Sequence, residues 1–155
     1  MSERIVPIAV NRILVALDGS DHSKKAAELA VDIAKKWSAE VNLIHVREEK
    51  NIPKGFKEYA EAERIPASNY FAMVCERDQF LGEAEDRLRE AGVKVAEPIC
   101  VFGDPADRII KEAKRVKADL IVMGSRGLGR FSKVFMGSVS TKVCNHAHCT
   151  CITVK

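Results

Sequence analysis

Glycine and serine residues with a fixed spacing follow an apolar run near the end of the chain. Gly124, Gly127, Gly137 and Ser138 give the pattern G-x2-G-x9-G-S directly after residues 120–123. A strand that leads into such a loop, and then into a helix, exposes backbone N–H groups and the positive end of a helix dipole. Glycine also lets the backbone take positive φ or approach a ligand closely. The pattern predicts a phosphate site, although the glycines could also serve only to turn the loop.

Alternating strands and helices position this loop. Short, nearly continuous apolar runs predict strands that are buried on both faces, and apolar residues at helical spacing predict helices between them. Ser20 or Asp21 is expected to cap the first helix, and Asp104 with Pro105 marks another helix start. Connections of this length imply right-handed parallel crossovers and a three-layer α/β/α sandwich. The predicted strands are residues 13–17, 41–46, 93–102, 120–123 and 149–154, and the last helix spans about 138–147.

Several segments together resemble one known family. The glycine spacing, with residues 118–125, 12–20 and 41–46 in the same order, is similar to the ATP-binding type of the universal stress protein family over roughly residues 11–155. The resemblance implies a five-stranded parallel sheet of order 3-2-1-4-5 with an adenine-nucleotide alpha-hydrolase-like fold. It also implies one domain over residues 1–155, with an N-terminal extension at 1–10 and a variable insertion at 47–69.

The resemblance further implies ATP as the cofactor, with Mg²⁺ or Mn²⁺ at the phosphates. Strand order 3-2-1-4-5 would bring the ends of the first and fourth strands together, with Asp18 beside the glycine loop. Asp18 could instead support only the turn at Gly19 and Ser20, and Val46, at the adenine position, could be a plain core valine. The residues expected to contact the nucleotide are Ala16, Asp18, Val46, Met123, Gly124, Arg126, Gly127, Gly137, Ser138, Val139 and Ser140.

The function that follows is nucleotide binding rather than efficient catalysis. The sequence contains no Gly-Lys-[Ser/Thr] of the P-loop type, and no general base is evident near the glycine loop, so we predict no catalytic residue and at most slow ATP hydrolysis. We expect a nucleotide-dependent stress-response switch, forming a homodimer through the C-terminal strand and read by an unknown protein partner. The alternative is a dimeric interaction module of the same fold that does not use nucleotide.

Composition favours one compact domain and argues against other classes. The 155 residues are 46% hydrophobic and 30% charged, with a net charge of only +3. The apolar runs are too short for a membrane span, and no basic, aromatic-rich segment suggests nucleic acid. The first ten residues are too interrupted for a signal peptide, so we expect a cytoplasmic protein. Residues 47–69, rich in charge and proline, predict a flexible connection around one short helical turn, acting as a lid, a partner surface or a solvated insertion.

Five cysteines raise a separate question about metal and redox chemistry. Cys144, Cys149 and Cys151 lie close to His146 and His148, which are residue types that bind zinc, but the spacing matches no common structural zinc pattern. Buried thiols and surface histidines remain the alternative. An odd number of cysteines without a disulfide framework predicts free thiols in a reducing compartment, including those at 75 and 100.

Overall fold

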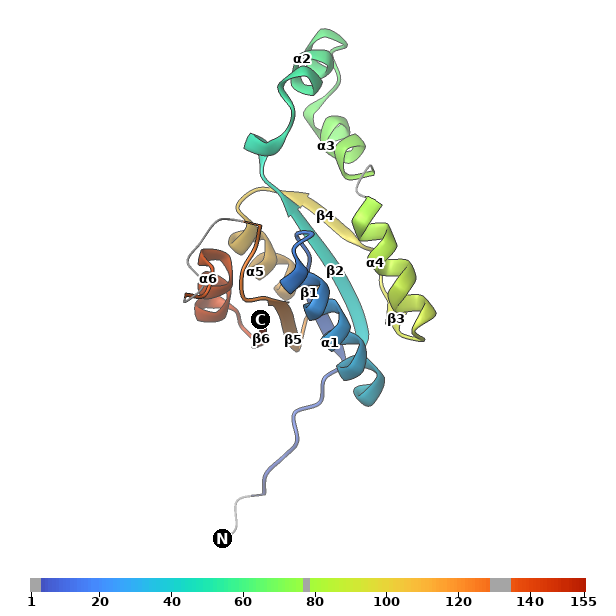
Figure 1. Ribbon diagram of the computed structural model, residues 1–155, viewed down its shortest axis with the longest axis vertical. Helices are drawn as coiled ribbons and strands as arrows, with labels where there is room; N and C mark the ends of the chain where they lie inside the picture. Colours follow the sequence, from blue (N-terminus) through green and yellow to red (C-terminus); the bar gives the residue numbers. More distant parts are fainter. Residues whose placement is uncertain (1–3, 77–78, 129–134) are drawn as a thin grey trace.

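The structure, a computed structural model, describes residues 4–76, 79–128 and 135–155. A single parallel sheet lies between two layers of helices (Figure 1). The strands are β1 (Arg12–Ala16), β2 (Glu40–Arg47), β3 (Lys94–Val95), β4 (Ile99–Phe102), β5 (Leu120–Gly124) and β6 (Thr150–Val154). The helices are α1 (Asp21–Trp37), α2 (Lys54–Ala62), α3 (Ala67–Glu76), α4 (Gln79–Glu90), α5 (Pro105–Arg115) and α6 (Ser138–His146), with a 3-10 turn η1 at Glu49–Asn51.

The strand order is β3-β2-β1-β5-β6, and β4 also pairs with β2, further along the same edge. This confirms the expected parallel α/β fold, but within the described residues the sheet has six strands instead of five, and the order differs slightly because β3 and β4 share the place of the third strand. The predicted third strand is divided into β3 and β4 because residues 96–98 leave the ladder. Pro98 lies in this break, and proline has no N–H to donate to β2. Both pieces still run parallel to β2.

The two faces of the sheet bury alternate residues of each strand. Ile13 and Val15 of β1 pack in one apolar cluster with α1 and α4, whereas Leu14 packs in a second cluster with α5 and α6. All three side chains are fully buried. Alternation with burial on both sides explains why the sequence of β1 reads as a continuous apolar run.

Short polar sequences begin the helices that flank the functional edge of the sheet. The Ser20 hydroxyl accepts a hydrogen bond from the Ser23 amide and caps α1. The Asp104 carboxylate caps α5 by accepting from the Asp107 amide at 2.9 Å, and Pro105 takes the first helical position. Both predicted helix starts are therefore confirmed, with Ser20 rather than Asp21 as the first cap.

Residues 48–76 form an arm beyond the carboxyl end of β2, carrying η1, α2 and α3 (Figure 1). The prediction of one short helical turn in residues 47–69 is wrong, because α2 alone has nine residues. A third, small apolar cluster holds the arm against β4. Its buried members are Ile52, Ala60, Val74 and Phe102.

A disulfide between Cys75 of α3 and Cys100 of β4 also joins the arm to the sheet, with the two Cα atoms 5.7 Å apart. The prediction of free thiols is therefore wrong for this pair. The two residues are 25 positions apart, and only the packing of α3 on β4 brings them together. Spacing in the sequence carries no sign of that packing.

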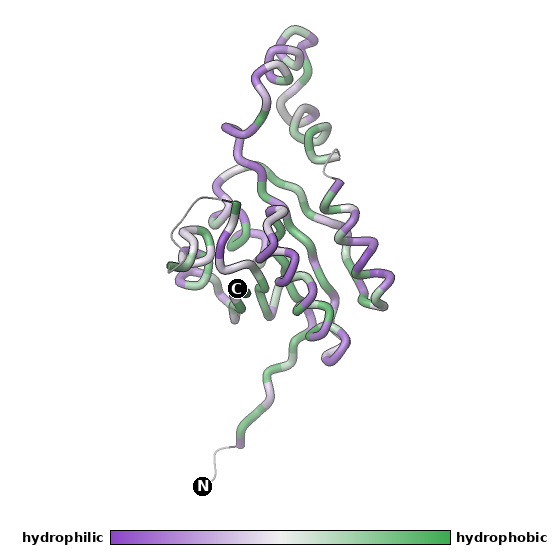
Figure 2. Tube along the Cα trace, viewed as in Figure 1, coloured by the Kyte–Doolittle hydropathy of each residue, from purple (hydrophilic) through white to green (hydrophobic). Residues whose placement is uncertain are grey.

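The first described residues extend away from the sheet (Figure 2). Residues 4–11 precede β1 and contain no strand or helix. The segment is apolar yet solvent-exposed, with Ile5 95%, Val6 79% and Ile8 71% exposed. None of the helices in the described part of the chain has both the length and the apolar character needed to cross a membrane.

Candidate functional site

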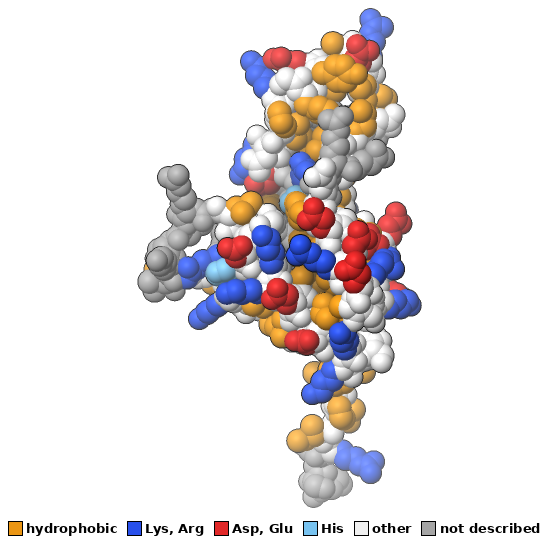
Figure 3. Space-filling view, turned by 45° about the vertical axis from the view of Figure 1, so that its right-hand side comes forward, with side chains coloured by type: hydrophobic (Ala, Val, Ile, Leu, Met, Phe, Trp, Pro, Cys, Tyr) orange, Lys and Arg blue, Asp and Glu red, His pale blue; other side chains and the backbone are white. Residues whose placement is uncertain are grey.

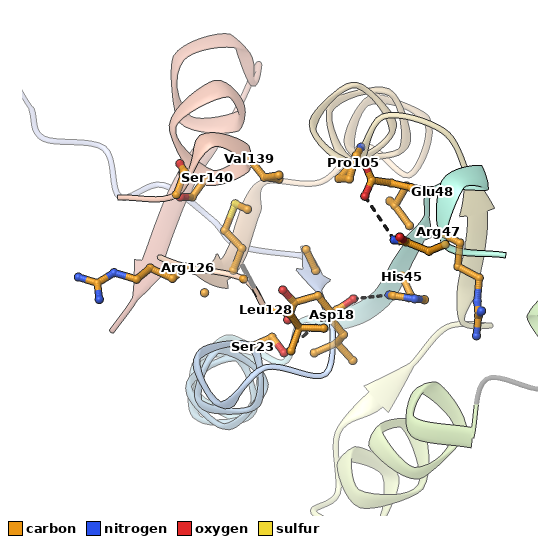
Figure 4. A pocket seen from close by; sticks show the side chains of 18 of the residues that line it. Asp18, Ser23, His45, Arg47, Glu48, Pro105, Arg126, Leu128, Val139 and Ser140 are labelled. Carbon is orange, nitrogen blue, oxygen red and sulfur yellow. Dashed lines mark hydrogen bonds between the residues drawn. The ribbon is translucent and has the colours of Figure 1, made fainter. Parts of the chain in front are cut away.

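The carboxyl ends of β1, β2 and β5 open into a cavity of about 710 Å³ (Figure 4). Because β1 pairs directly with β5, residues that follow the two strands meet at this edge. All eleven residues expected from the sequence line the cavity. They are Ala16, Asp18, Val46, Met123, Gly124, Arg126, Gly127, Gly137, Ser138, Val139 and Ser140.

Ser125, which is buried, joins the two ends of the glycine loop. Its amide donates to the Val154 carbonyl of β6 at 2.7 Å, and its own carbonyl accepts from the Gly137 amide at 2.8 Å. The Ser140 hydroxyl donates to the same carbonyl at 2.9 Å. The Ser125 hydroxyl in turn shares a hydrogen bond of 3.2 Å with Nδ1 of His22. The start of α6 is thus fixed against the end of β5 by backbone contacts.

The three glycines are required for close packing. A Cβ added at Gly124 would lie 2.8 Å from Cβ of His22, and one at Gly127 would lie 2.7 Å from Oδ2 of Asp18. At Gly137 it would lie 3.2 Å from the Ser125 carbonyl oxygen. None of the three has positive φ. Lack of space inside the protein therefore explains these glycines, and left-handed backbone does not; close approach to a ligand stays a prediction.

Asp18 combines the two roles that the sequence left open. Its Oδ1 accepts a hydrogen bond from the Ser20 amide at 2.9 Å, which is the turn contact. Its Oδ2 faces Gly127 across the cavity wall, so the same carboxylate also lies beside the glycine loop. One oxygen therefore holds the turn and the other is directed toward the loop.

Charged residues line the cavity unevenly. Arg126 lies in its wall, but Nε donates to the Phe135 carbonyl at 3.3 Å and the guanidinium is directed away from Asp18 (Figure 4). On the other side, Asp104 and Pro105 bring the start of α5 into the wall, next to the start of α6. Two helix N-termini therefore contribute partial positive charge to the same cavity.

Lys142 of α6 ties these two helix starts together. Its Nζ lies 2.8 Å from Oδ1 of Asp107 and 3.3 Å from Oδ1 of Asp104. The Asp107 amide, with a smaller contribution from Lys142, lowers the pKa of Asp104 below its ordinary value. The hydrogen bond to Asp107, and then that to Asp104, raises the pKa of Lys142. Asp104 therefore carries a carboxylate at the rim at neutral pH.

The sequence missed the wall formed by β2 and the arm. Nδ1 of His45 donates a hydrogen bond to the Leu17 carbonyl at 2.7 Å. Because a carbonyl oxygen only accepts, Nδ1 carries the proton. The His45 ring packs edge-on against Phe80 of α4, with centroids 4.6 Å apart. Glu48 and Ile52 of the arm complete this wall. The place of Glu48 directly after the carboxyl end of β2 is the signal that could have predicted it, whereas Ile52 reaches the wall through the fold of the arm.

The C-terminal cysteines lie outside the cavity. Cys144, Cys149 and Cys151 are half-buried free thiols. Burial, reinforced by Cys144 and Cys149, raises the pKa of Cys151 to about 12, and burial also raises the pKa of Cys149. Over residues 4–76, 79–128 and 135–155, no three His, Cys, Asp or Glu side chains gather in a way that could hold a metal ion.

The sequence and the fold of this chain are both similar to those of known proteins. The Universal stress protein family profile matches residues 9–155. Universal stress protein YxiE of Bacillus subtilis is 31% identical, covering 94% of this chain and 99% of its own. The solved structure of the hypothetical protein MJ0577 has a TM-score of 0.78 at 26% identity, covering 96% of this chain and 97% of its own. A universal stress protein solved in complex with cAMP has a TM-score of 0.66 at 28% identity, with 95% and 98% coverage.

Proposed function

This chain belongs to the universal stress protein family, and from that membership we propose that the cavity binds an adenine nucleotide, with ATP as the physiological ligand. The observation that carries the proposal is the close approach at Gly127, where any side chain would meet Asp18. Asp18 and Gly127 also both line the cavity, so a backbone without a side chain at position 127 lets a ligand approach the loop there.

The phosphate end of the nucleotide fits the glycine loop and the two helix starts. Gly137 and Ser138 begin α6, so backbone N–H groups and the positive end of its dipole face this region. At the start of α5, Pro105 has no N–H and the Asp107 amide donates to Asp104, so this helix adds its dipole rather than free donors. The Ser138 hydroxyl adds a donor there, whereas the Ser140 hydroxyl is used by the carbonyls of Ser125 and Gly137. We therefore assign Ser140 to holding the loop rather than to direct phosphate contact.

The base end fits the wall formed by β1 and β2. Ala16 and Val46 offer apolar surface and backbone groups at the ends of these strands. A cavity of about 710 Å³ is within the usual range for a small-molecule site. That a relative was solved with cAMP supports an adenine ligand in this chain.

Nucleotide binding would act as a regulatory switch rather than as a step of efficient catalysis. Asp18 Oδ2 is the carboxylate oxygen best placed to hold Mg²⁺ or Mn²⁺ beside the phosphates, and the sequence has no P-loop lysine. We expect turnover well below the roughly 1–100 s⁻¹ of dedicated phosphoryl-transfer enzymes. The switch would act in a homodimer formed through β6 and would be read by a protein partner. The runner-up function is a dimeric interaction module that binds no nucleotide.

Two measurements test the proposal. Mass spectrometry of small molecules released from freshly purified protein should find an adenine nucleotide, and calorimetry should then give saturable binding of ATP. Gly127→Val should abolish that binding while the far-ultraviolet circular dichroism is unchanged. Absence of binding of ATP, AMP and cAMP to the folded protein would favour the interaction module instead.

A further inference from the structure

We propose that the Cys75–Cys100 disulfide is a reversible redox modification site that controls the cavity by fixing the arm, residues 48–76, against the sheet. The proposal rests on the function proposed above, because it assigns a regulation to the same nucleotide site. Two independent contacts link the disulfide to the cavity wall.

The first contact runs through the sheet. Cys100 of β4 is the direct register partner of His45 in β2. His45 lines the cavity, where it bonds to the Leu17 carbonyl and packs against Phe80. The cysteine that anchors the disulfide is thus one strand away from a side chain of the wall.

The second contact runs through the arm. Ile52 lines the cavity and is also a buried member of the small cluster that includes Val74 and Phe102, with Cys75 packed against it. Phe71 of α3 and Phe102 of β4 are in ring contact, with centroids 4.4 Å apart. The residues that shape the cavity rim and the residues around the disulfide therefore belong to one packed unit.

The arm has little else to keep it in place. Its apolar cluster has four buried residues, fewer than half of the number in either main cluster. Isolated domains of fewer than about 40 residues generally need a disulfide, a metal or a partner, and the arm relies in the same way on its contacts with β4. Figure 3 shows the arm extending beyond the main body of the molecule, with apolar side chains gathered over it. The covalent link is consequently the strongest attachment of the arm to the sheet.

The chemistry needs only a dithiol reductant. Neither cysteine is fully buried, and reduction begins when an incoming thiolate reaches one of the two sulfurs. That thiolate attacks the sulfur, the S–S bond breaks, and a mixed disulfide forms with release of the other cysteine as a thiolate. The second thiolate of the reductant then displaces the remaining cysteine. In total, two electrons and two protons pass from the reductant to the protein. The products are two protein thiols and one oxidised dithiol.

Reduction should loosen the arm and weaken nucleotide binding together. Once Cys75 is released, α3 loses its covalent link to β4 and keeps the contacts of the small cluster, so Ile52 and Glu48 should be held less firmly in the wall. Coupling between two sites of a protein usually changes affinity by about 5- to 150-fold. We expect reduced protein to bind ATP more weakly by a factor in that range.

The experiment compares the full chain in its oxidised form and after treatment with dithiothreitol. Amide hydrogen exchange over residues 48–76 should be faster after reduction, and calorimetry should show weaker ATP binding. Cys75→Ser should resemble the reduced wild type under both conditions. Cys144→Ser, which removes a free thiol outside the cavity, is the matched control and should respond to reduction as the wild type does.

The outcomes separate the two proposals. If neither form binds ATP, the proposed function fails, and the exchange of the arm still decides whether the disulfide is a tether. The proposal that the disulfide fixes the arm is overturned if amide hydrogen exchange over residues 48–76 is equal in both forms. It is also overturned if peptide mass spectrometry finds Cys75 and Cys100 as thiols in air-oxidised protein. Equal ATP affinity in both forms, with altered exchange, overturns the control of the cavity.

Discussion

At the scale of single residues, the contact between Gly127 and Asp18 is the most sensitive point of the site. Gly127→Ala would introduce a Cβ 2.7 Å from Oδ2 of Asp18, so either the carboxylate or the loop must shift. Overpacking of this kind costs about 1–3 kcal/mol, which corresponds to roughly ten- to hundredfold weaker ATP binding if the displacement is relieved in the loop. Calorimetry with ATP measures the effect.

Gly55→Ala is the control for that substitution. Gly55 lies in the first turn of α2, and a Cβ there would meet nothing within 4 Å. Alanine should stabilise the helix by about 0.5–1 kcal/mol and leave ATP affinity unchanged. Equal affinity of the Gly127→Ala variant and the wild type would show that the nucleotide does not depend on this approach.

Asn42 is a second sensitive residue, for stability. It lies in β2, is 5% exposed, and within the described residues its Nδ2 has no hydrogen-bond partner. A buried donor without a partner costs about 1–3 kcal/mol, so Asn42→Leu should raise the free energy of unfolding by about 1 kcal/mol. Urea unfolding tests this, with exposed Asn11→Leu as the comparison. A loss of stability would mean that Asn42 has a partner after all.

Many residues of the site could be predicted because the residues that follow the carboxyl ends of parallel strands lie together at one edge of the sheet. The same rule, applied to β2 and β4, would have added His45 and Asp104. Ile52 was beyond it, since its place depends on how the arm folds back. The reason for the glycines was only half predictable, because a sequence does not distinguish positive φ from lack of space.

At the scale of elements, periodicity predicted the main strands and the starts of α1, α5 and α6, and it failed for the helices of the arm, where tertiary contacts override it. Pro98 divides the third strand, yet β3 and β4 remain on one edge because both pair with β2. The arm reads as polar and irregular, and its helices are held by contacts with β4 and by the disulfide. Neither contact can be derived from local pattern.

The Asp104 cap at the start of α5 makes the stability of the protein depend on pH. The pKa of Asp104 is lowered from 3.8, mainly by the Asp107 amide, so the folded state favours the carboxylate. Its stabilising contribution is therefore complete above about pH 4 and is lost as the pH falls through the lower folded pKa. A helix cap is worth about 1 kcal/mol, and the exposure of Asp104 makes the titrating part smaller.

Asp104→Asn isolates this contribution, since asparagine keeps a capping oxygen but does not titrate. Urea unfolding should find the wild type more stable than the variant at pH 7, and the difference should shrink toward zero near pH 3. A difference that stays constant between these pH values would mean that the charge of Asp104 does not stabilise the helix start.

At the scale of the whole molecule, β6 forms an edge of the sheet. It pairs with β5 on one side, and among the described residues no strand pairs with its other side. Partly apolar edges such as this associate unless they are covered, and antiparallel pairing of two copies about a two-fold axis would cover both. Acidic and basic side chains are interspersed on the face of the main body shown in Figure 3.

We expect the wild type to sediment as a dimer at tens of micromolar and Ile152→Pro to sediment as a monomer or precipitate, because proline removes a ladder donor from β6. Circular dichroism of the soluble fraction checks that the sheet persists. Removal of residues 1–10 is the companion variant, because Ile5 and Ile8 are also apolar and exposed. A monomeric wild type, or a dimer lost only with residues 1–10, would contradict pairing through β6.

The hydrogen bond from the Ser125 amide to the Val154 carbonyl also bears on how this protein can be handled and labelled. A tag or fluorescent protein attached next to Val154 would disturb this bond and, through it, the loop that shapes the cavity. A label next to the exposed residues 5–8 would lie on the segment that extends away from the sheet. Reporter fusions and immobilised protein should therefore be built from the N-terminus, and affinities obtained with C-terminal fusions should differ from those of the untagged chain.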